Sequence, residues 1–225
     1  MTTISPREKH SFSIPPLENG DSLISPEFER RYSAMPHLKK AQLIEGTVYM
    51  ASPLRFEPHA EPHANLIIWL GNYKVATPGV RLGDNPTVRL DLDNEPQPDA
   101  VLLIDSQSGG QSRLSDDGYI EGAPELVVEI SASTATIDLR DKKRAYRRNG
   151  VKEYIVWQVS DRQFNWFVLE GGDYTSLTPD NNIIKSRVFP GLWLSVSALL
   201  AGDMAEVLKT LQTGLASGEH QNFQL

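Results

Sequence analysis

The sequence predicts one domain of the α/β class, in which strands and helices share a core. Apolar runs of strand length, bounded by turn residues, recur along the chain and are clearest at residues 98–105 and 125–131. Helical periodicity separates such runs, as at residues 138–149, where Gly150 is typical of a helix end. The 225 residues suffice for one well-buried domain, and no change of composition calls for two.

Composition limits the classes of function. The chain has no cysteine, which excludes disulfides and thiolate metal sites and fits a reducing cytoplasm. Its apolar runs fall short of the ~20 residues of a membrane helix, and its first residues lack the apolar core of a signal peptide. A net charge of −7 argues against a general polyanion-binding surface but leaves room for a local basic groove. We expect a soluble cytoplasmic protein without a membrane partner.

The N-terminal part is predicted to hold a leader, a helix and a hairpin. Residues 1–24 are polar and rich in proline, which predicts a flexible leader. Ser25 as the cap and Pro26 as the first residue then predict a helix. Residues 41–50 read as a hairpin that turns at Glu45, which is either a turn residue, as the pattern favours, or a carboxylate delivered to a site.

Residues 56–63 are rich in metal-ligand side chains but do not predict a zinc site. The order His59, Glu61, His63 differs from the His-Glu-x-x-His of helical zinc proteases. Two prolines argue against a helix there and hence against i, i+4 spacing of the histidines. His63 opens a predicted buried helix at 65–73, where it either points inward or is solvated.

The remaining segments predict a flap and scaffold elements. Residues 106–118 form a long loop rich in Gly and Ser, which we expect to cover the site. Residues 204–225 are expected to form a C-terminal helix and tail beyond a main domain at 25–203. Further strands are expected at 87–92, 153–159, 164–169 and 174–177. A closing segment at 188–192 and an amphipathic helix at 196–211 follow, and the apolar face of this helix suits a core or a dimer seam.

Two acids stand at the ends of apolar strands. Glu129 interrupts the run Leu-Val-Val-Glu-Ile-Ser, where burying an ionised carboxylate is costly unless it is paired or binds a metal. Asp99 precedes the other apolar run in a similar way. The plainer reading of Glu129 is a side chain that reaches water at a strand end. With the carbonyl of Ile130, the two carboxylates form an oxygen set suited to Mg²⁺ or Mn²⁺.

The helix predicted at 138–149 presents a polar stripe. Asp138, Lys142 and Tyr146 are four residues apart and share one face. They are either a surface ion pair beside a packed tyrosine, or part of a site in which the Lys142 ammonium stabilises charge or orients a water. The same helix carries a basic cluster, which is either a solvated face or a phosphate-binding face: Lys143, Arg144, Arg147 and Arg148.

These motifs together resemble a known family. Pro98-Asp99, Glu125 to Ser131, the Asp138–Lys142–Tyr146 stripe and the run Gly-Val-Lys-Glu-Tyr at 150–154 are similar to the putative restriction endonuclease family of the PD-(D/E)XK nuclease superfamily. The similarity spans residues 26–203. It implies a restriction-endonuclease-like mixed β-sheet core flanked by helices, with Asp99 and Glu129 as metal ligands. It also implies that Glu45 joins the site and that His63 occupies a position where the family commonly has His.

One departure affects the expected activity. The superfamily pattern puts lysine two residues after the glutamate, where this chain has Ser131. Lys142 would then be the migrated lysine, with Lys143 as the fallback. We expect a Mg²⁺- or Mn²⁺-dependent endonuclease that acts on DNA, as a homodimer. The alternatives are a weak or inactive nuclease-fold module that binds nucleic acid, and a hydrolase of another phosphoester.

Overall fold

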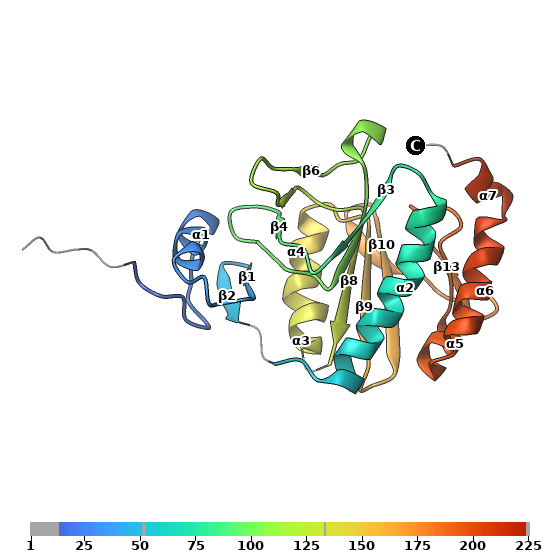
Figure 1. Cartoon of the computed structure of the whole chain (residues 1–225), viewed down its shortest axis with the longest axis horizontal. Coiled ribbons are helices and arrows are strands. Elements are labelled where there is room, and N and C mark those ends of the chain that lie inside the picture. Colours follow the sequence, from blue (N-terminus) through green and yellow to red (C-terminus); the bar gives the residue numbers. More distant parts are fainter. Residues whose placement is uncertain (1–13, 51–52, 133, 224–225) are drawn as a thin grey trace, which may run out of the picture.

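A six-stranded mixed β-sheet forms the centre of the computed structural model, which describes residues 14–50, 53–132 and 134–223 (Figure 1). The strand order is β11-β10-β9-β8-β5-β3, and β8 and β9 alone pair in parallel within this sheet. The predicted mixed sheet is therefore confirmed. Its strands are β3 (Val80–Asp84), β5 (Ala100–Ile104), β8 (Leu126–Ser131), β9 (Glu153–Gln158), β10 (Gln163–Glu170) and β11 (Asp173–Ser176).

Helices cover both faces of the sheet, as predicted. One face packs against α2 (Glu61–Ala76), α5 (Val196–Ala201) and α6 (Met204–Leu215). The connection from β8 to β9 lies on the other face and consists of α3 (Ala135–Ile137), a π-helical turn η3 (Asp138–Lys142) and α4 (Lys143–Arg148). Successive side chains of β8 alternate between the two cores, so this strand is buried on both faces and needs its continuous apolar sequence.

The predicted flap lies at the wrong end of the sheet to cover the site. Residues 106–118 leave the C-terminal end of β5, whereas Asp99 directly precedes its N-terminal end, and five strand residues separate these ends by about 17 Å. The segment begins with the 3₁₀ turn η2 (Ser106–Ser108) and leads into a three-stranded sheet at the top of Figure 1. That sheet comprises β4 (Val88–Arg89), β6 (Arg113–Leu114) and β7 (Ile120–Glu121).

The N-terminal lobe contains α1 (Ser25–Ser33) and the predicted hairpin of β1 (Ala41–Ile44) and β2 (Thr47–Met50), at the left of Figure 1. Ser25 is already helical and gives no side-chain cap, so its predicted capping role is wrong. Within the predicted leader, Leu17 is 3% exposed and packs on the core of the hairpin. Residues 1–13 lie outside the described residues.

Residues 56–63 are helical, contrary to the prediction. A π-helical turn η1 (Phe56–Ala60) continues directly into α2, and Pro62 lies in the first turn of α2. Proline is tolerated in a first turn because the N–H groups there have no partner within the helix. His59 and His63 therefore lie on successive turns, with ring centroids 5.9 Å apart.

The C-terminal helix is shorter and more broken than predicted. Gly202, with a φ of +77°, ends α5, and Asp203 then caps α6 by accepting a hydrogen bond from the Glu206 N–H at 3.1 Å. The apolar face of α6 packs into the main core, as one of the two readings expected. The other elements are β12 (Ile183–Lys185), β13 (Trp193–Ser195) and α7 (Gly218–Gln221). Within the described residues, none of the helices has the length and apolar character needed to span a membrane.

Trp69 on α2 should be a main determinant of stability. Its side chain is fully buried, meets Trp166 edge to face and donates from Nε1 to the Trp193 carbonyl at 3.0 Å. Trp69→Ala should lower the free energy of unfolding by about 3–5 kcal/mol, because a large cavity replaces the indole. Urea unfolding would measure this. The neighbouring Ile68→Ala is the control, since Ile68 is 46% exposed; an equal loss in both variants would contradict the assignment.

Candidate functional site

Asp99 and Glu129 lie opposite each other on the paired inner strands β5 and β8 of the central sheet, at the start of β5 and near the end of β8. β5 and β8 are antiparallel with Ala100 opposite Val128, so the next pair in this register is Asp99 and Glu129, on the same face. Antiparallel pairing thus brings the start of one strand beside the end of the other. Both acids are almost fully buried, at 4% and 3% exposure.

The two acids line a cavity of about 660 Å³. Its walls come from the N-terminal hairpin, the segment that leads into η1, and the connection after β8. Besides Asp99 and Glu129, the polar and charged side chains that line it include Lys40, Gln42, Tyr49, Arg55, His59, Thr134, Asp138, Lys142 and Ser160.

Asp99 is held as a carboxylate by three donors. Its Oδ2 accepts a hydrogen bond from the Ile130 N–H at 2.7 Å, while its Oδ1 lies 3.4 Å from His59 Nε2 and 3.7 Å from Lys40 Nζ. Burial raises the pKa of Asp99, but the His59 hydrogen bond and the Lys40 charge outweigh burial and bring that pKa to about 2. Asp99 is therefore ionised at neutral pH.

Glu129 is paired from the opposite side of the cavity. Its Oε2 lies 2.9 Å from Lys142 Nζ, and its Oε1 accepts a hydrogen bond from the Tyr146 hydroxyl at 2.8 Å. Burial raises the pKa of Glu129 to about 7, opposed by the Lys142 charge and reinforced by Asp138 and Asp99. Burial by itself lowers the pKa of Lys142, but Glu129 and Asp138 together raise it above the usual value, so the ammonium stays charged.

The predicted stripe Asp138–Lys142–Tyr146 faces Glu129, although η3 is a π-helical turn rather than the expected α-helix. Asp138 Oδ1 lies 3.4 Å from Lys142 Nζ, and Tyr154 donates from its hydroxyl to the Asp138 carbonyl at 2.9 Å. The fallback lysine does not reach the acids: Lys143 Nζ lies over the Phe167 ring, 3.4 Å from its centroid. Lys142 is therefore the lysine that the structure brings to Glu129.

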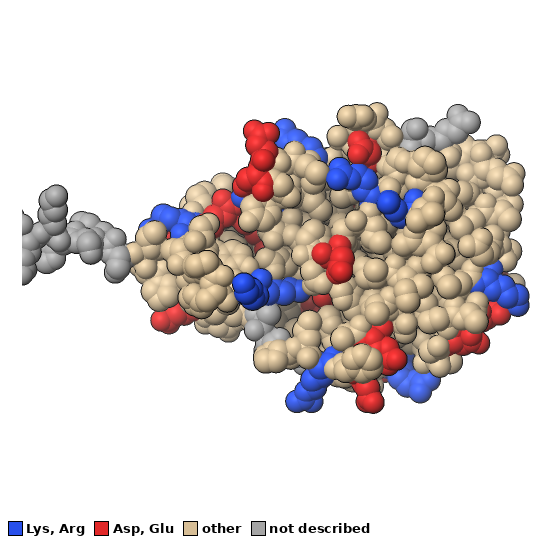
Figure 2. All heavy atoms as spheres, in the orientation of Figure 1, with Lys and Arg blue, Asp and Glu red and all other residues tan. Residues whose placement is uncertain are grey.

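Glu45 forms ion pairs with two arginines of the basic cluster, Arg144 and Arg148. Glu45 occupies the hairpin turn with a φ of 50° and forms ion pairs with Arg144 at 2.8 Å and Arg148 at 2.9 Å. Arg147 pairs with Asp173. Glu45 is not among the residues that line the cavity, so its role in the site stays a prediction, and the arginines of the cluster have acidic partners. Acidic and basic side chains are likewise interspersed on the face drawn in Figure 2.

His63 and Ser131 contact the periphery of the site. His63 Nε2 lies 2.9 Å from the backbone carbonyl of Asp99 and 3.1 Å from Asp84 Oδ1, so it steadies the chain at Asp99 rather than its carboxylate. Ser131 Oγ is 3.5 Å from Thr134 Oγ1. The sequence did not single out Lys40, and it assigned His59 no role in the site. The four-residue spacing of His59 and His63 indicates a shared helix face, but only if residues 56–63 are taken as helical.

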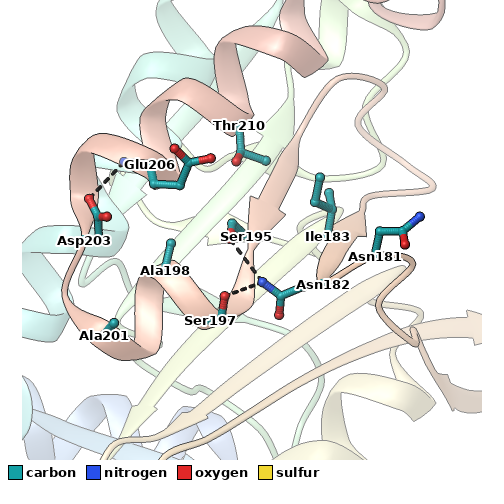
Figure 3. A pocket seen from close by; sticks show the side chains of 10 residues that line it. All are labelled: Asn181, Asn182, Ile183, Ser195, Ser197, Ala198, Ala201, Asp203, Glu206 and Thr210. Atoms are coloured by element: carbon teal, nitrogen blue, oxygen red, sulfur yellow. Dashed lines mark hydrogen bonds between the residues drawn. The ribbon is translucent and has the colours of Figure 1, made fainter.

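A second cavity, of about 570 Å³, lies near α5, α6 and the start of β12 (Figure 3). Its polar groups bond to one another: Asn182 Nδ2 donates to Ser195 and Ser197 hydroxyls, and Asp203 caps α6. It lacks the buried, charge-compensated acids of the first cavity, which is therefore the candidate active site.

Comparison with known proteins identifies the family of the chain. The model of the Uma2 family, described as putative restriction endonuclease, matches residues 25–197. The chain belongs to this family. A crystal structure of a putative nuclease belonging to DUF820 from Anabaena variabilis has the same fold, with a TM-score of 0.60 at 13% identity over 76% of this chain and 96% of that chain. No curated protein matches the sequence.

The oxygen donors of this family member suit a hard divalent cation. Mg²⁺ is commonly held by one or two carboxylates and keeps several waters. The N–H of Ile130 points toward Asp99. In a strand the N–H and the carbonyl of one residue point to the same side, so the Ile130 carbonyl also points toward the side of Asp99. Among the described residues, no group of three or more His, Cys, Asp or Glu is arranged to hold a metal. The two carboxylates and the Ile130 carbonyl are oxygen donors of the kind that Mg²⁺ or Mn²⁺ accepts when water supplies the remaining ligands.

The raised pKa of Glu129 should appear in the pH dependence of stability. A carboxyl group whose pKa rises from 4.5 to about 7 on folding contributes stability that is complete below about 4.5 and is lost as the pH rises through 7. Glu129→Gln removes this titration. In EDTA, the stability of the wild type relative to Glu129→Gln should therefore fall between pH 5 and pH 8, as measured by urea unfolding. The exposed Glu57→Gln is the control, and a difference that stays constant or grows with pH would refute the assignment.

Proposed function

We propose that the chain is a Mg²⁺- or Mn²⁺-dependent endonuclease that hydrolyses phosphodiester bonds of DNA. The observation that carries the proposal is the convergence of Asp99, Glu129 and Lys142 on one cavity, each of them buried. Membership of a restriction endonuclease family supports hydrolysis of DNA as the reaction.

In this proposal Asp99, Glu129 and the carbonyl of Ile130 hold the cation. When bound, such a cation polarises a phosphoryl oxygen and lowers the pKa of a water. The two carboxyl groups differ in protonation at neutral pH: Asp99 is ionised, whereas Glu129 has a pKa of about 7. Cation binding requires Glu129 to lose its proton, so metal affinity should rise with pH.

Lys142 supplies the fixed positive charge of the site. Its ammonium lies 2.9 Å from Glu129 Oε2 and remains protonated, so it is suited to stabilise negative charge that develops on a phosphate or to orient the attacking water. Asp138 and Tyr146 act as positioning residues: Asp138 pairs with Lys142, and Tyr146 donates to Glu129. They fix the direction from which the ammonium approaches.

A second candidate is a nuclease-fold module that binds nucleic acid without cleaving it. The ion pair between Lys142 and Glu129 favours this reading, because it engages the ammonium and one carboxylate oxygen with each other. DNA binding that is unaffected by Glu129→Gln, together with no calorimetric signal on adding Mn²⁺, would select this candidate over the endonuclease.

Lys142→Ala should reduce DNA cleavage by about a hundredfold or more, because it removes a preorganised charge from the reacting phosphate. Cleavage of plasmid, single-stranded and branched DNA would be measured with Mg²⁺ or Mn²⁺. The adjacent Lys143→Ala is the matched control, since its ammonium lies over Phe167 and should leave the rate within a few-fold. The proposal fails if the wild type cleaves none of these substrates, or if Asp99→Ala cleaves as fast as the wild type.

Asp99→Asn should abolish the binding of Mn²⁺ measured by calorimetry, because the amide keeps the shape of the carboxylate and loses its charge. The exposed Asp161→Asn should bind as the wild type does. Undiminished Mn²⁺ binding by Asp99→Asn would exclude Asp99 as a ligand.

A further inference from the structure

Two large apolar side chains stand in solvent beside the mouth of the active-site cavity. Leu54 is 61% exposed and Phe56 is 69% exposed, and Arg55 lies between them. We propose that Leu54 and Phe56, the apolar rim, pack against an unpaired nucleobase of the DNA strand held in the site, with Arg55 between them. The preferred substrate would then be single-stranded DNA, or DNA whose bases are unpaired near the scissile bond. This inference rests on the proposed endonuclease function and specifies its substrate class.

The rim is continuous with the site. Leu54 and Arg55 line the same cavity as Asp99 and Glu129, and Phe56 follows them directly. When a phosphate of a DNA strand reaches Asp99 and Glu129, the bases next to that phosphate therefore lie near the apolar rim. Exposed aromatic side chains near a backbone-binding groove are typical of proteins that hold single strands, because every base presents a face for stacking.

The rim is anchored to the catalytic acids by η1. In this π-helical turn the Ala60 N–H donates to the Arg55 carbonyl at 3.2 Å, and the Glu61 N–H donates to the Phe56 carbonyl. The same turn directs Phe56 outward and His59 inward, where His59 is 7% exposed and contacts Asp99. The distance from a stacked base to the acids is therefore fixed by one turn of helix.

The cavity lining holds cationic side chains as well as the acids Asp99, Glu129 and Asp138. Lys40 and Arg55 line the cavity, and within the described part of the chain Arg55 has no ion pair or side-chain hydrogen bond. In contrast, Arg144, Arg147 and Arg148, the arginines of the basic cluster, are compensated by acids. A cavity lined by few cations beside exposed apolar side chains suits one phosphate and its base better than a long duplex, whose binding depends on many phosphate contacts.

The test is binding in EDTA, which separates recognition from cleavage. Single-stranded oligonucleotides and matched duplexes carrying 2-aminopurine would be titrated with the full chain, and quenching of the base would report stacking. Phe56→Ala should weaken single-strand binding about tenfold and remove the quenching, because it removes the stack between the base and the aromatic ring. Duplex binding should change less than twofold, and Phe56→Trp should retain the wild-type behaviour.

Val75→Ala is the matched control, because Val75 is 80% exposed on α2 and should leave binding unchanged. Leu54→Ala, at the second rim position, should weaken single-strand binding in the same direction. Four outcomes would overturn the inference: no single-strand binding by the wild type, unchanged quenching in Phe56→Ala, an equal loss on duplex, or an effect of Phe56→Ala confined to self-association in light scattering. A chain that stacks through Phe56 but cleaves no DNA would refute the endonuclease and leave the apolar rim in place.

Discussion

Burial of two carboxylates at neighbouring strand ends is the constraint on which the surrounding structure depends. An ionised carboxylate inside a core is tolerated only when opposite charges and donors surround it. Here the compensating groups for Asp99 and Glu129 come from three separate parts of the chain: Lys40 before the hairpin, His59 from η1, and Lys142 with Tyr146 from the connection after β8. The charge compensation of the two acids therefore depends on how these three elements pack together.

Not every buried acid of this sheet belongs to the site. Glu125 and Glu153 are both fully buried, yet backbone N–H groups satisfy them: Ile104 and Gln111 donate to Glu125, and Arg187 and Val188 donate to Glu153. Such acids fix loops to strands. Glu129 differs because it lines a cavity and its close partners are the Lys142 ammonium, which lines the same cavity, and the Tyr146 phenol. The partners of a buried acid, rather than its burial, separate structural acids from candidate ligands.

The central strands were predictable from sequence because two-sided burial demands continuous apolar residues, and β5, β8 and β9 all meet that demand. Asp99, Glu129 and Lys142 stood out for the related reason that charges are rare in such surroundings. The errors concern features decided by contacts between distant segments. Proline was taken to exclude a helix at residues 56–63, although it lies in a first turn.

Long-range pairing also decides features that the local sequence left open. Glu45 was either a turn residue or a site carboxylate, and its charge is taken up by Arg144 and Arg148, about a hundred residues later in the chain. The leader was taken as flexible because its few apolar residues do not show that Leu17 meets the hairpin core. In each case the local pattern was read correctly, and the partner that decides its role lay elsewhere in the sequence.

The lysine that pairs with Glu129 comes from the connection between β8 and β9 and not from a strand. Ser131 lies on the same strand face as Glu129, two residues on, but carries no charge, so a cation must arrive from outside the strand. It comes from η3, and this route brings Asp138 against the same ammonium. Lys142 therefore serves two acids, one on the strand and one on its own turn. A lysine on β8 would approach Glu129 from the strand alone, whereas here the position of the charge depends on how the π-helical turn packs on the sheet.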